Sequence, residues 1–189
     1  LVKSEKTLSL CESLRIFVEM AKGLQTAHEA GIIHRDIKPA NVLLTDKRQV
    51  KIVAFGLAKV APNDETEDHQ TRFRTSGTPG YMAPEQIKGE PLMPRTDIYA
   101  LGITLFHMII GQPPHRLKNL KKEFDILNFQ VSGQYPSLSE LKPEVPEGID
   151  KLYRYCVAQN PEDRYQSVGA FLPTAEGWLR KLEEKQGNV

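Results

Sequence analysis

Residues 34–41 read His-Arg-Asp-Ile-Lys-Pro-Ala-Asn, and they lie between two short runs of apolar residues. Apolar runs of this length are typical of strands, and the proline between them favours a loop over a helix. The loop brings together the carboxylate of Asp36, the ammonium of Lys38 and the amide of Asn41. Such a set can take up a proton, neutralise an anion and offer an oxygen to a cation.

Four further motifs follow, in the order Ala54-Phe55-Gly56, Ala83-Pro84-Glu85, Asp97-Ile98-Tyr99-Ala100-Leu101-Gly102 and Asn160-Pro161-Glu162-Asp163-Arg164. Together with residues 34–41 they resemble the C-terminal lobe of a eukaryotic-type Ser/Thr protein kinase. One His-Arg-Asp triplet is a weak match, but five motifs in one order across about 130 residues are specific. The resemblance covers nearly the whole chain. The compact lobe that this chain would form is similar to that of bacterial eukaryotic-like kinases.

The resemblance implies a mainly α fold. It is the helical bundle of a kinase C-terminal lobe with a small β-hairpin platform under the catalytic loop. It assigns residues 1–189 to this lobe, residues 34–41 to the catalytic loop and residues 54–85 to the activation segment. No G-x-G-x-x-G and no V-A-I-K-like strand stands before residue 34. We therefore expect the N-terminal β-lobe to be missing from this sequence.

The catalytic residues implied by the resemblance are Asp36, Lys38 and Asn41. Phosphoryl transfer depends on positioning and on neutralising charge. Asp36 would orient the incoming hydroxyl and take its proton, and Lys38 would place a positive charge on the γ-phosphate of ATP. In this family a lysine at this position accompanies Ser/Thr rather than Tyr substrates. Asn41 would offer its amide oxygen to Mg²⁺, so ATP and Mg²⁺ are the implied cofactors.

Ala54 stands where the family has the aspartate that holds Mg²⁺ against the phosphates. A methyl group cannot ligate a hard cation that requires oxygen. Loss of this ligand is expected to raise the barrier by roughly 4 kcal/mol, which is about a thousandfold in rate. Because Asp36, Lys38 and Asn41 are intact, we favour an engineered kinase-dead substitution over natural loss. An alanine at this position in the native gene would contradict that hypothesis.

Arg35, Thr71 and Thr75 are the candidate regulatory residues. In the family the arginine beside the catalytic aspartate grips a phosphorylated activation loop through charge-assisted hydrogen bonds. Thr71 and Thr75 are the leading candidate phosphosites, and Arg72 and Arg74 interleave with them. The alternatives are solvated loop threonines and, for Arg35, a structural salt bridge.

A second set of residues is expected to support the site rather than to react. By resemblance, the hydroxyl of Thr78 would bond Asp36 and Lys38. The carboxylate of Asp97 would accept backbone N–H groups of the catalytic loop. The supporting residues that the resemblance implies are His34, Phe55, Gly56, Thr78, Glu85, Asp97 and Arg164.

The resemblance also implies specific contacts for two of these supporting residues, Glu85 and His34, and for one candidate nucleotide-binding residue, Leu43. Glu85 would pair with Arg164 and so anchor the activation segment, and a buried pair of this kind is costly to break from one side. His34 would pack near Phe55 rather than act as a base. Leu43 is the candidate floor of the adenine pocket, and plain core carries equal weight for it.

The composition is that of an ordinary globular chain, with 40% hydrophobic residues, 26% charged residues and a net charge of +1. No global field therefore argues for nucleic acid or a membrane as a partner. The longest apolar run, Ile98 to Ile110, is too short to cross a bilayer. Cys11 and Cys156 show no metal or disulfide spacing, which favours a reduced, cytoplasmic setting.

The implied partner is a protein substrate with a Ser or Thr acceptor. An uncovered inter-lobe face would leave apolar surface exposed, which predicts that the chain can self-associate. The basic cluster Arg116, Lys118, Lys121 and Lys122 is interpreted as a solvated helix face rather than a docking patch.

The hydrophobic pattern predicts a first helix that Ser9 caps and Gly31 ends. The activation segment carries little regular pattern, which is typical of a functional loop. Predicted strands are 32–33, 42–44 and 50–53, and predicted helices are about 9–30, 95–111, 119–130, 148–158, 167–173 and 174–185.

Three functions remain open. The leading hypothesis is a Ser/Thr kinase lobe disabled at Ala54. The alternative is a natural pseudokinase that uses the helical lobe as a binding or scaffold module. A kinase-like enzyme acting on a small molecule is weaker, because Gly77-Thr78-Pro79 and Ala83-Pro84-Glu85 resemble a platform that receives a peptide.

Overall fold

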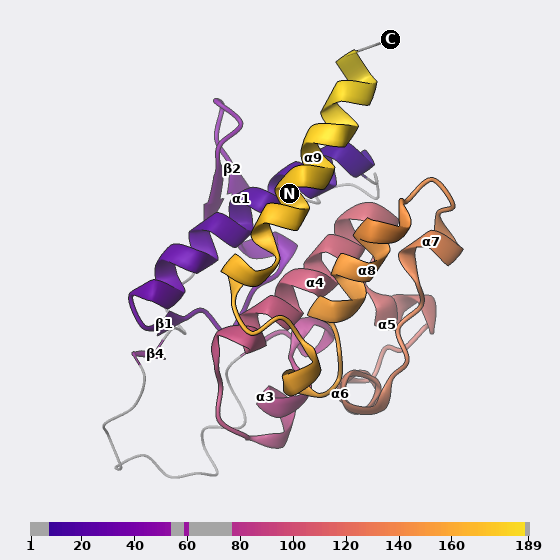
Figure 1. Ribbon diagram of the computed structural model, residues 1–189. Coiled ribbons are helices and arrows are strands. Elements are labelled where there is room, and N and C mark those ends of the chain that lie inside the picture. Colours follow the sequence, from indigo (N-terminus) through magenta and orange to yellow (C-terminus); the bar gives the residue numbers. More distant parts are fainter. Residues whose placement is uncertain (1–7, 54–58, 61–76, 188–189) are drawn as a thin grey trace.

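The structure is a computed structural model of the 189-residue chain, and it describes residues 8–53, 59–60 and 77–187 (Figure 1). The mainly α fold expected from the sequence is confirmed. Short 3₁₀ turns connect several elements, among them η1 (Pro39–Asn41), η3 (Pro79–Tyr81), η4 (Pro161–Asp163) and η5 (Val168–Ala170). The α-helices are α1 (Leu10–Glu29), α3 (Pro84–Lys88), α4 (Pro94–Ile110), α5 (Pro114–Leu117), α6 (Glu123–Ser132), α7 (Leu138–Leu141), α8 (Glu147–Cys156) and α9 (Leu172–Gly187).

Helix α4 is the centre of the core and is buried along most of its length. From Ile98 to Ile110 most of its residues are apolar on every side, as expected of a helix that other helices surround. Helices α1 and α8 pack against it, and Figure 1 shows it lying between them. Pro94 occupies the first turn, where its missing N–H costs nothing, and Gly111 ends the helix in the left-handed region at φ 90°.

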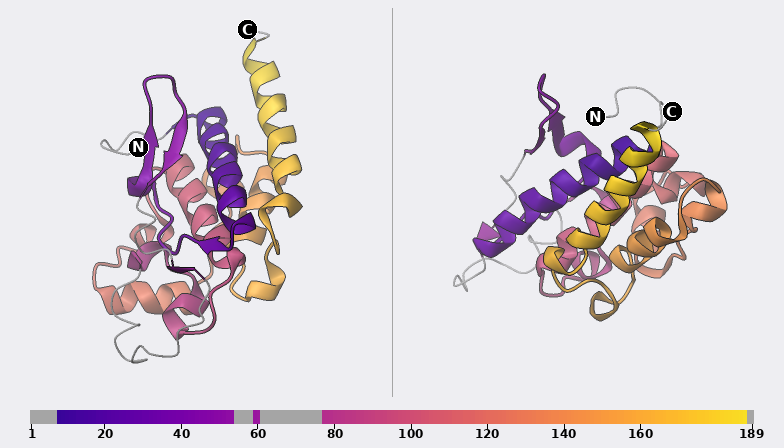
Figure 2. Two further views of the ribbon diagram at one scale, coloured as in Figure 1. Left: turned by 90° about the vertical axis from the view of Figure 1, so that its left-hand side faces the viewer. Right: turned by 45° about the horizontal axis from the view of Figure 1, so that its top comes forward.

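Helix α1 begins where the sequence predicts, since the Ser9 hydroxyl accepts a hydrogen bond from the backbone N–H of Glu12. It ends at Glu29, and Gly31 follows with φ 74°. Helix α9 packs against α1, and both views of Figure 2 show the two helices side by side. The contact includes a ring pair between Phe17 and Phe171 at the base of α9.

Two small antiparallel sheets flank the loop of residues 34–41. Strands β2 (Val42–Leu44) and β3 (Val50–Ile52) pair with Val42 opposite Ile52, so the predicted hairpin is confirmed. Strand β1 (Ile32–Ile33) pairs instead with β4 (Lys59–Val60). The sequence analysis did not predict β4, because two residues are too few to show an alternating pattern.

Other element boundaries differ from the prediction. The helix predicted at 119–130 is wrong in its first four residues. Asn119 has φ 55° there, and the backbone N–H of Leu120 bonds back to the carbonyl of His115, so a turn separates α5 from α6. The helix predicted at 167–173 is the single 3₁₀ turn η5, and α9 starts two residues earlier than predicted. Short helices α3, α5 and α7 were not predicted, since each has about one turn.

Gly102 allows α4 and α8 to approach closely, which leads to the first prediction. A Cβ at Gly102 would lie 2.7 Å from Cβ of Cys156 and 2.7 Å from Cγ1 of Val157. We expect Gly102→Ala to lower the free energy of unfolding by about 1–3 kcal/mol through overpacking. Gly177→Ala is the matched control. Its new Cβ meets nothing closer than 4.0 Å within α9, so it should raise stability by about 0.5–1 kcal/mol.

Urea denaturation of both variants and the parent chain measures these changes. A stable Gly102→Ala variant, with a midpoint equal to that of the parent, would contradict the close contact between α4 and α8.

Candidate active site

Asp97 anchors the loop of residues 34–41 from beneath. It lies in the first turn of α4 with 1% of its surface exposed. Its Oδ2 accepts the backbone N–H of His34 at 2.8 Å, and its Oδ1 accepts the backbone N–H of Arg35 at 2.8 Å. A carboxylate that accepts two backbone N–H groups in a buried site makes strong, charge-assisted hydrogen bonds. The start of the loop is thereby fixed to the central helix.

Arg35 has a backbone conformation that requires this anchor. Its φ is +71°, in the left-handed region that costs a residue with a side chain roughly 1–2 kcal/mol. Asp97 holds its N–H, and the side-chain amide of Gln86 in α3 donates to its carbonyl at 2.9 Å. Burial lowers the pKa of the Arg35 guanidinium, and the charge of Asp97 partly opposes this. The loop therefore turns sharply at Arg35, and hydrogen bonds from α3 and α4 hold that turn in place.

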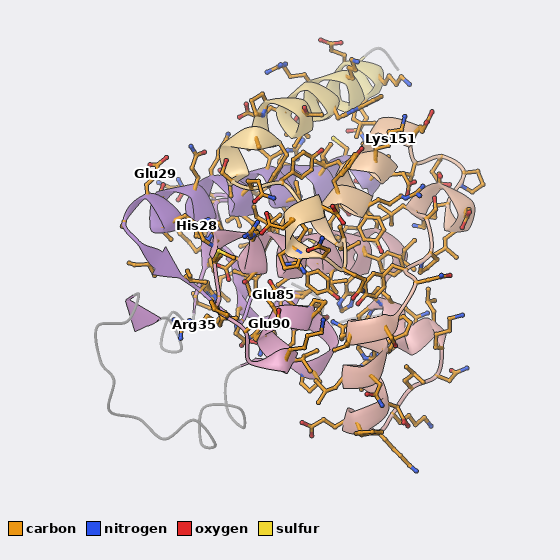
Figure 3. All side chains as sticks on the ribbon, turned by 60° about the horizontal axis from the view of Figure 1, so that its bottom comes forward. His28, Glu29, Arg35, Glu85, Glu90 and Lys151 are labelled. Carbon is orange, nitrogen blue, oxygen red and sulfur yellow. The ribbon has the colours of Figure 1, made fainter. Side chains whose placement is uncertain are left out.

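His28 is a third partner of Asp97 that the sequence analysis missed as part of the site. Its Nε2 lies 2.8 Å from Oδ2 of Asp97. Figure 3 shows His28 on α1 and Arg35 on the segment that follows β1. The signal was available: His28 is a polar residue that follows the apolar positions of the helix at helical spacing. It ties α1 to α4 and to the loop through one carboxylate.

Asp36, Lys38, Asn41 and Thr78 form one polar cluster, which we call the catalytic cluster. Oδ1 of Asp36 accepts from the Thr78 hydroxyl at 3.0 Å. Oδ2 of Asp36 pairs with Nζ of Lys38 at 2.7 Å and accepts from Nδ2 of Asn41 at 2.9 Å. Lys38 also donates to the Thr78 hydroxyl at 2.5 Å. Thr78 thus joins three neighbouring loop residues at one carboxylate from a distant part of the sequence.

The cluster carries the groups that proton transfer and charge neutralisation need. Asp36 is 7% exposed, so its carboxylate is mostly buried but still accessible to solvent. The ammonium of Lys38 and the amide of Asn41 hold its Oδ2, and the Thr78 hydroxyl holds its Oδ1. Oδ1 of Asn41 accepts no hydrogen bond from the described residues, because the amide turns its Nδ2 toward Asp36. An unengaged amide oxygen is a suitable ligand for a hard cation.

The described residues do not complete a metal site by themselves. Within residues 8–53, 59–60 and 77–187, no three His, Cys, Asp or Glu side chains come together in a way that could hold a metal ion. Position 54, where the resemblance expects a carboxylate ligand, is an alanine in the sequence and lies outside the described residues. Asn41 is therefore the sole predicted ligand whose position the structure gives.

His34 is fully buried and is used as a structural side chain. Its Nε2 donates to the backbone carbonyl of Val53 at 3.0 Å, while its Nδ1 accepts the backbone N–H of Asp36 at 3.3 Å. Both contacts together require the neutral tautomer with the proton on Nε2. His34 thus links the loop of residues 34–41 to the segment after β3. The expected packing on Phe55 involves a residue outside the described part of the chain.

Leu43 lies on β2 with 53% of its surface exposed, whereas Val42 beside it is buried. The alternative interpretation, that these strand residues only fill the hydrophobic core, is correct for Val42 and wrong for Leu43. An exposed leucine on a strand beside the catalytic cluster is compatible with the floor of an adenine pocket, and that role stays a prediction.

Glu85 and Arg164 form a buried bidentate ion pair between α3 and the turn after η4. Nη1 and Nη2 of Arg164 donate to the two carboxylate oxygens of Glu85 at 2.7 and 2.8 Å. The same guanidinium donates to the backbone carbonyls of Ala158 and Gln159, and it lies over the ring of Tyr99 at 4.8 Å. Each side of the pair is about fully buried. The pair fixes α3 to the turn after η4 at the helical base.

Several predicted residues cannot be placed. The predicted residues that lie outside the described part of the chain are Ala54, Phe55, Gly56, Thr71 and Thr75. Their roles stay predictions.

The turn after Thr78 contains one contact that the sequence analysis did not foresee. The hydroxyl of Tyr81 in η3 lies 2.5 Å from Nδ1 of His107 in α4. Burial, helped by the nearby Arg116 and His115, lowers the pKa of His107 from 6.5 to about 4. His107 is therefore neutral at pH 7 and serves as a hydrogen-bond partner for the turn.

The buried ion pair gives the second prediction. Glu85→Gln leaves the Arg164 guanidinium buried without a counter-charge, so we expect a loss of about 3 kcal/mol in the free energy of unfolding. Glu162→Gln is the matched control. It removes the partner of Arg95, but the Glu162 side chain is 69% exposed, so the loss should stay below about 1 kcal/mol.

Chemical denaturation of the two variants under the same conditions decides the point. Equal and small losses would show that the Glu85 pair contributes no more than a surface contact.

The low pKa of His107 gives the third prediction. The unfolded chain protonates this histidine below about pH 6.5, whereas the folded protein keeps it neutral down to about pH 4. The unfolded state then binds more protons in this window, so the free energy of unfolding falls as the pH drops through it. Between pH 7 and pH 5.5 this loss should be roughly 1–2 kcal/mol.

His107→Gln should remove that part of the pH dependence. The measurement is urea unfolding of the parent chain and the variant at both pH values. Identical pH dependence in the two proteins would refute the assignment to His107.

Among the described residues, no helix combines the length and the apolar character that crossing a membrane requires. The profile of the protein kinase domain family matches residues 1–172. The match ends at the start of α9, so it takes in the catalytic cluster, Asp97 and the Glu85–Arg164 pair.

Three similar proteins are bacterial protein kinases. A probable serine/threonine-protein kinase PknB of Corynebacterium glutamicum is 34% identical over 166 residues, which is 83% of this chain and 24% of that protein. A probable serine/threonine-protein kinase of Clostridium acetobutylicum is 34% identical over 172 residues, 91% of this chain and 25% of its own length. The tyrosine-protein kinase MasK of Myxococcus xanthus is 36% identical over 177 residues, 88% of this chain and 26% of its own length.

The chain therefore spans about a quarter of the length of these curated relatives. The family match covers most of the chain and includes the loop, the anchor and the buried pair described above. On this evidence the chain belongs to the protein kinase domain family and is similar to bacterial Ser/Thr kinases.

Proposed function

We propose that this domain serves the transfer of the γ-phosphoryl group of ATP to Ser or Thr hydroxyls of protein substrates. The observation that carries the proposal is the catalytic cluster, in which Asp36, Lys38, Asn41 and Thr78 meet around one carboxylate. The hydrogen bonds from Asp97 to the loop add support, because catalysis of this reaction is mainly positioning and charge stabilisation.

Each member of the cluster has a proposed role. Asp36 orients the substrate hydroxyl and accepts its proton, since its carboxylate is shielded and already accepts hydrogen bonds. Lys38 is 21% exposed and can move its ammonium toward a phosphate anion. Thr78 holds both side chains together from the turn at η3. Leu43 would lie against the adenine ring of ATP.

Specificity for Ser and Thr over Tyr is part of the proposal. The contact between Lys38 and Thr78 supports it, because it brings the turn at η3 close to Asp36 and favours a short acceptor side chain. Most of the similar proteins quoted above carry a Ser/Thr designation, while one is named a tyrosine kinase. Phosphoamino-acid analysis of the reaction product distinguishes the two outcomes.

Mg²⁺ is the proposed metal, and it would draw on Asn41. A bound magnesium ion would neutralise charge on the phosphates, but the described residues supply one amide oxygen for it. With Ala54 in place of a carboxylate, we propose that the chain as written transfers phosphate weakly or not at all. The loss is expected to be about a thousandfold.

Regulation through the activation segment is proposed for the same site. A phosphate on Thr71 or Thr75 would carry close to two negative charges and three acceptor oxygens. Arg35 is suited to receive it, because its backbone is fixed by Asp97 and Gln86. The order of this segment would then depend on phosphorylation.

A natural pseudokinase is the second candidate function, and Ala54 is the observation that favours it. In that case the helical lobe is a binding module whose partner recognises its surface rather than its chemistry. Partner binding would then survive Asp36→Asn and Lys38→Met, whereas substrate binding through the cluster would not.

The fourth prediction tests the proposed activity. In the protein at its natural length, including any residues before Leu1, Ala54→Asp should raise phosphate transfer from labelled ATP and Mg²⁺ to a basic protein by about a thousandfold. Adding Asp36→Asn to Ala54→Asp should abolish the gain, which serves as the control for a contaminating kinase.

If Ala54→Asp transfers no more phosphate than the parent protein, the kinase proposal fails and the pseudokinase takes its place. Transfer by the unmodified protein at the level of the Ala54→Asp variant would instead overturn the proposed loss of activity.

A further inference from the structure

A hollow of about 250 Å³ opens beside the catalytic cluster, and we call it the cationic groove. One wall is the turn from Thr78 through η3. The other walls come from the end of α4, from α5 and from the start of α6. Its lining residues are Thr78, Pro79, Gly80, Tyr81, His107, Pro113, His115, Arg116, Lys121, Glu123 and Ile126.

The groove begins at a residue of the catalytic cluster. Thr78 lines the groove and also donates to Oδ1 of Asp36 at 3.0 Å. A peptide whose hydroxyl lies at Asp36 would therefore pass the mouth of the groove. Because an extended chain advances about 3.3 Å per residue, the side chain that enters belongs to one of the few residues on either side of the acceptor.

The floor of the groove is firmly packed. His115 is 9% exposed and lies under the η3 turn, so that a Cβ at Gly80 would come within 2.2 Å of its ring. Tyr81 and His107 stack and share a hydrogen bond on the neighbouring side. A groove with so rigid a floor discriminates among side chains at low entropic cost.

The lining carries positive charge at its rim. Arg116 and Lys121 are exposed, and neither makes an ion pair with the described residues. Glu123 is the acidic member of the lining, so one positive charge remains in excess. Burial lowers the pKa of His107 and His115, so both rings favour the neutral form at pH 7.

The field of Arg116 reaches into the groove. Burial lowers the pKa of His107 and His115, and the charge of Arg116 lowers both further. Burial raises the pKa of Tyr81, and the charge of Arg116 partly opposes that rise. The basic cluster expected from the sequence thus divides into two pairs. Arg116 and Lys121 line the groove, whereas Lys118 and Lys122 lie outside it as solvated residues.

We propose that the cationic groove selects protein substrates with an aspartate or glutamate close to the phosphorylated residue, and that Arg116 and Lys121 are the residues that determine this preference. The proposal rests on the proposed kinase function, since it assigns the substrate class of the same site. The argument is charge complementarity: an acidic side chain would meet two cations that make no ion pair with the described residues, beside a neutral, firmly packed floor.

The test measures peptide binding to the full chain, residues 1–189, without ATP. The probes are fluorescein-labelled 11-residue peptides with a central serine and a single glutamate placed at each flanking position in turn. Each is compared with the same peptide carrying glutamine. At low ionic strength we expect about a fivefold tighter binding of the glutamate peptide at one or two positions, the range of a partly exposed ion pair.

Matched charge variants locate the effect. Arg116→Glu and Lys121→Glu should remove or reverse the preference for glutamate. Lys118→Glu and Lys122→Glu change the net charge by the same amount outside the groove and should keep it. Circular dichroism and thermal unfolding of all four variants serve as the control that the exposed substitutions leave the fold intact.

Three results would overturn the proposal. One is the absence of any position that prefers glutamate, and another is an equal loss in Lys118→Glu and Arg116→Glu, which would indicate a general field. The third is a rise in affinity when the chain's own acidic residues at 64, 65, 67 and 68 are changed to amides, which would make that run the occupant.

The experiments distinguish a failure of the proposed groove specificity from a failure of the proposed kinase function. The binding comparison needs no phosphate transfer, so a glutamate preference that depends on Arg116 supports the groove even in an inactive protein. Phosphate transfer by the Ala54→Asp protein with no such preference would overturn the groove alone.

Discussion

The carboxylate of Asp97 is the constraint on which the rest of the site depends. It is buried at the start of the central helix and binds three groups, the backbone N–H of His34, the backbone N–H of Arg35 and the ring of His28. A buried charge is tolerated when hydrogen bonds satisfy it, and here those bonds hold a left-handed residue in place. The direction in which the loop presents Asp36 follows from that anchor.

A second buried charge fixes the opposite side of the site. Arg164 holds Glu85 and three backbone carbonyls, so α3 and the turn that carries Thr78 sit on a rigid base. Thr78 then closes the catalytic cluster by bonding Asp36 and Lys38. The polar cluster is thus built between two buried ionic anchors. Removing one partner of such an anchor costs more than any surface contact nearby.

Sequence patterns predicted the parts of the fold with strong local signals. The Ser9 cap, the apolar run of α4 and the hairpin of β2 and β3 are of this kind, and the family resemblance anticipated the contacts of Asp97, Thr78 and Glu85. The turn at residues 119–122 was wrongly predicted as helix because it depends on one left-handed residue, Asn119. Strand β4, the His28 contact and the floor of the cationic groove depend on pairings between distant segments, which no local pattern records.

The most direct test of this account is amide hydrogen exchange, measured residue by residue by NMR in the parent chain and in Asp97→Asn. Asparagine keeps one acceptor oxygen where aspartate has two, so at least one of the His34 and Arg35 amides loses its partner. We predict that both amides exchange slowly in the parent chain and that at least one of them exchanges at least about tenfold faster in the variant, the effect of losing roughly 1.4 kcal/mol of protection. The amide of Val53, which bonds to Asn41, should change little. Equal protection of His34 and Arg35 in both proteins would contradict the claim that Asp97 positions the catalytic loop.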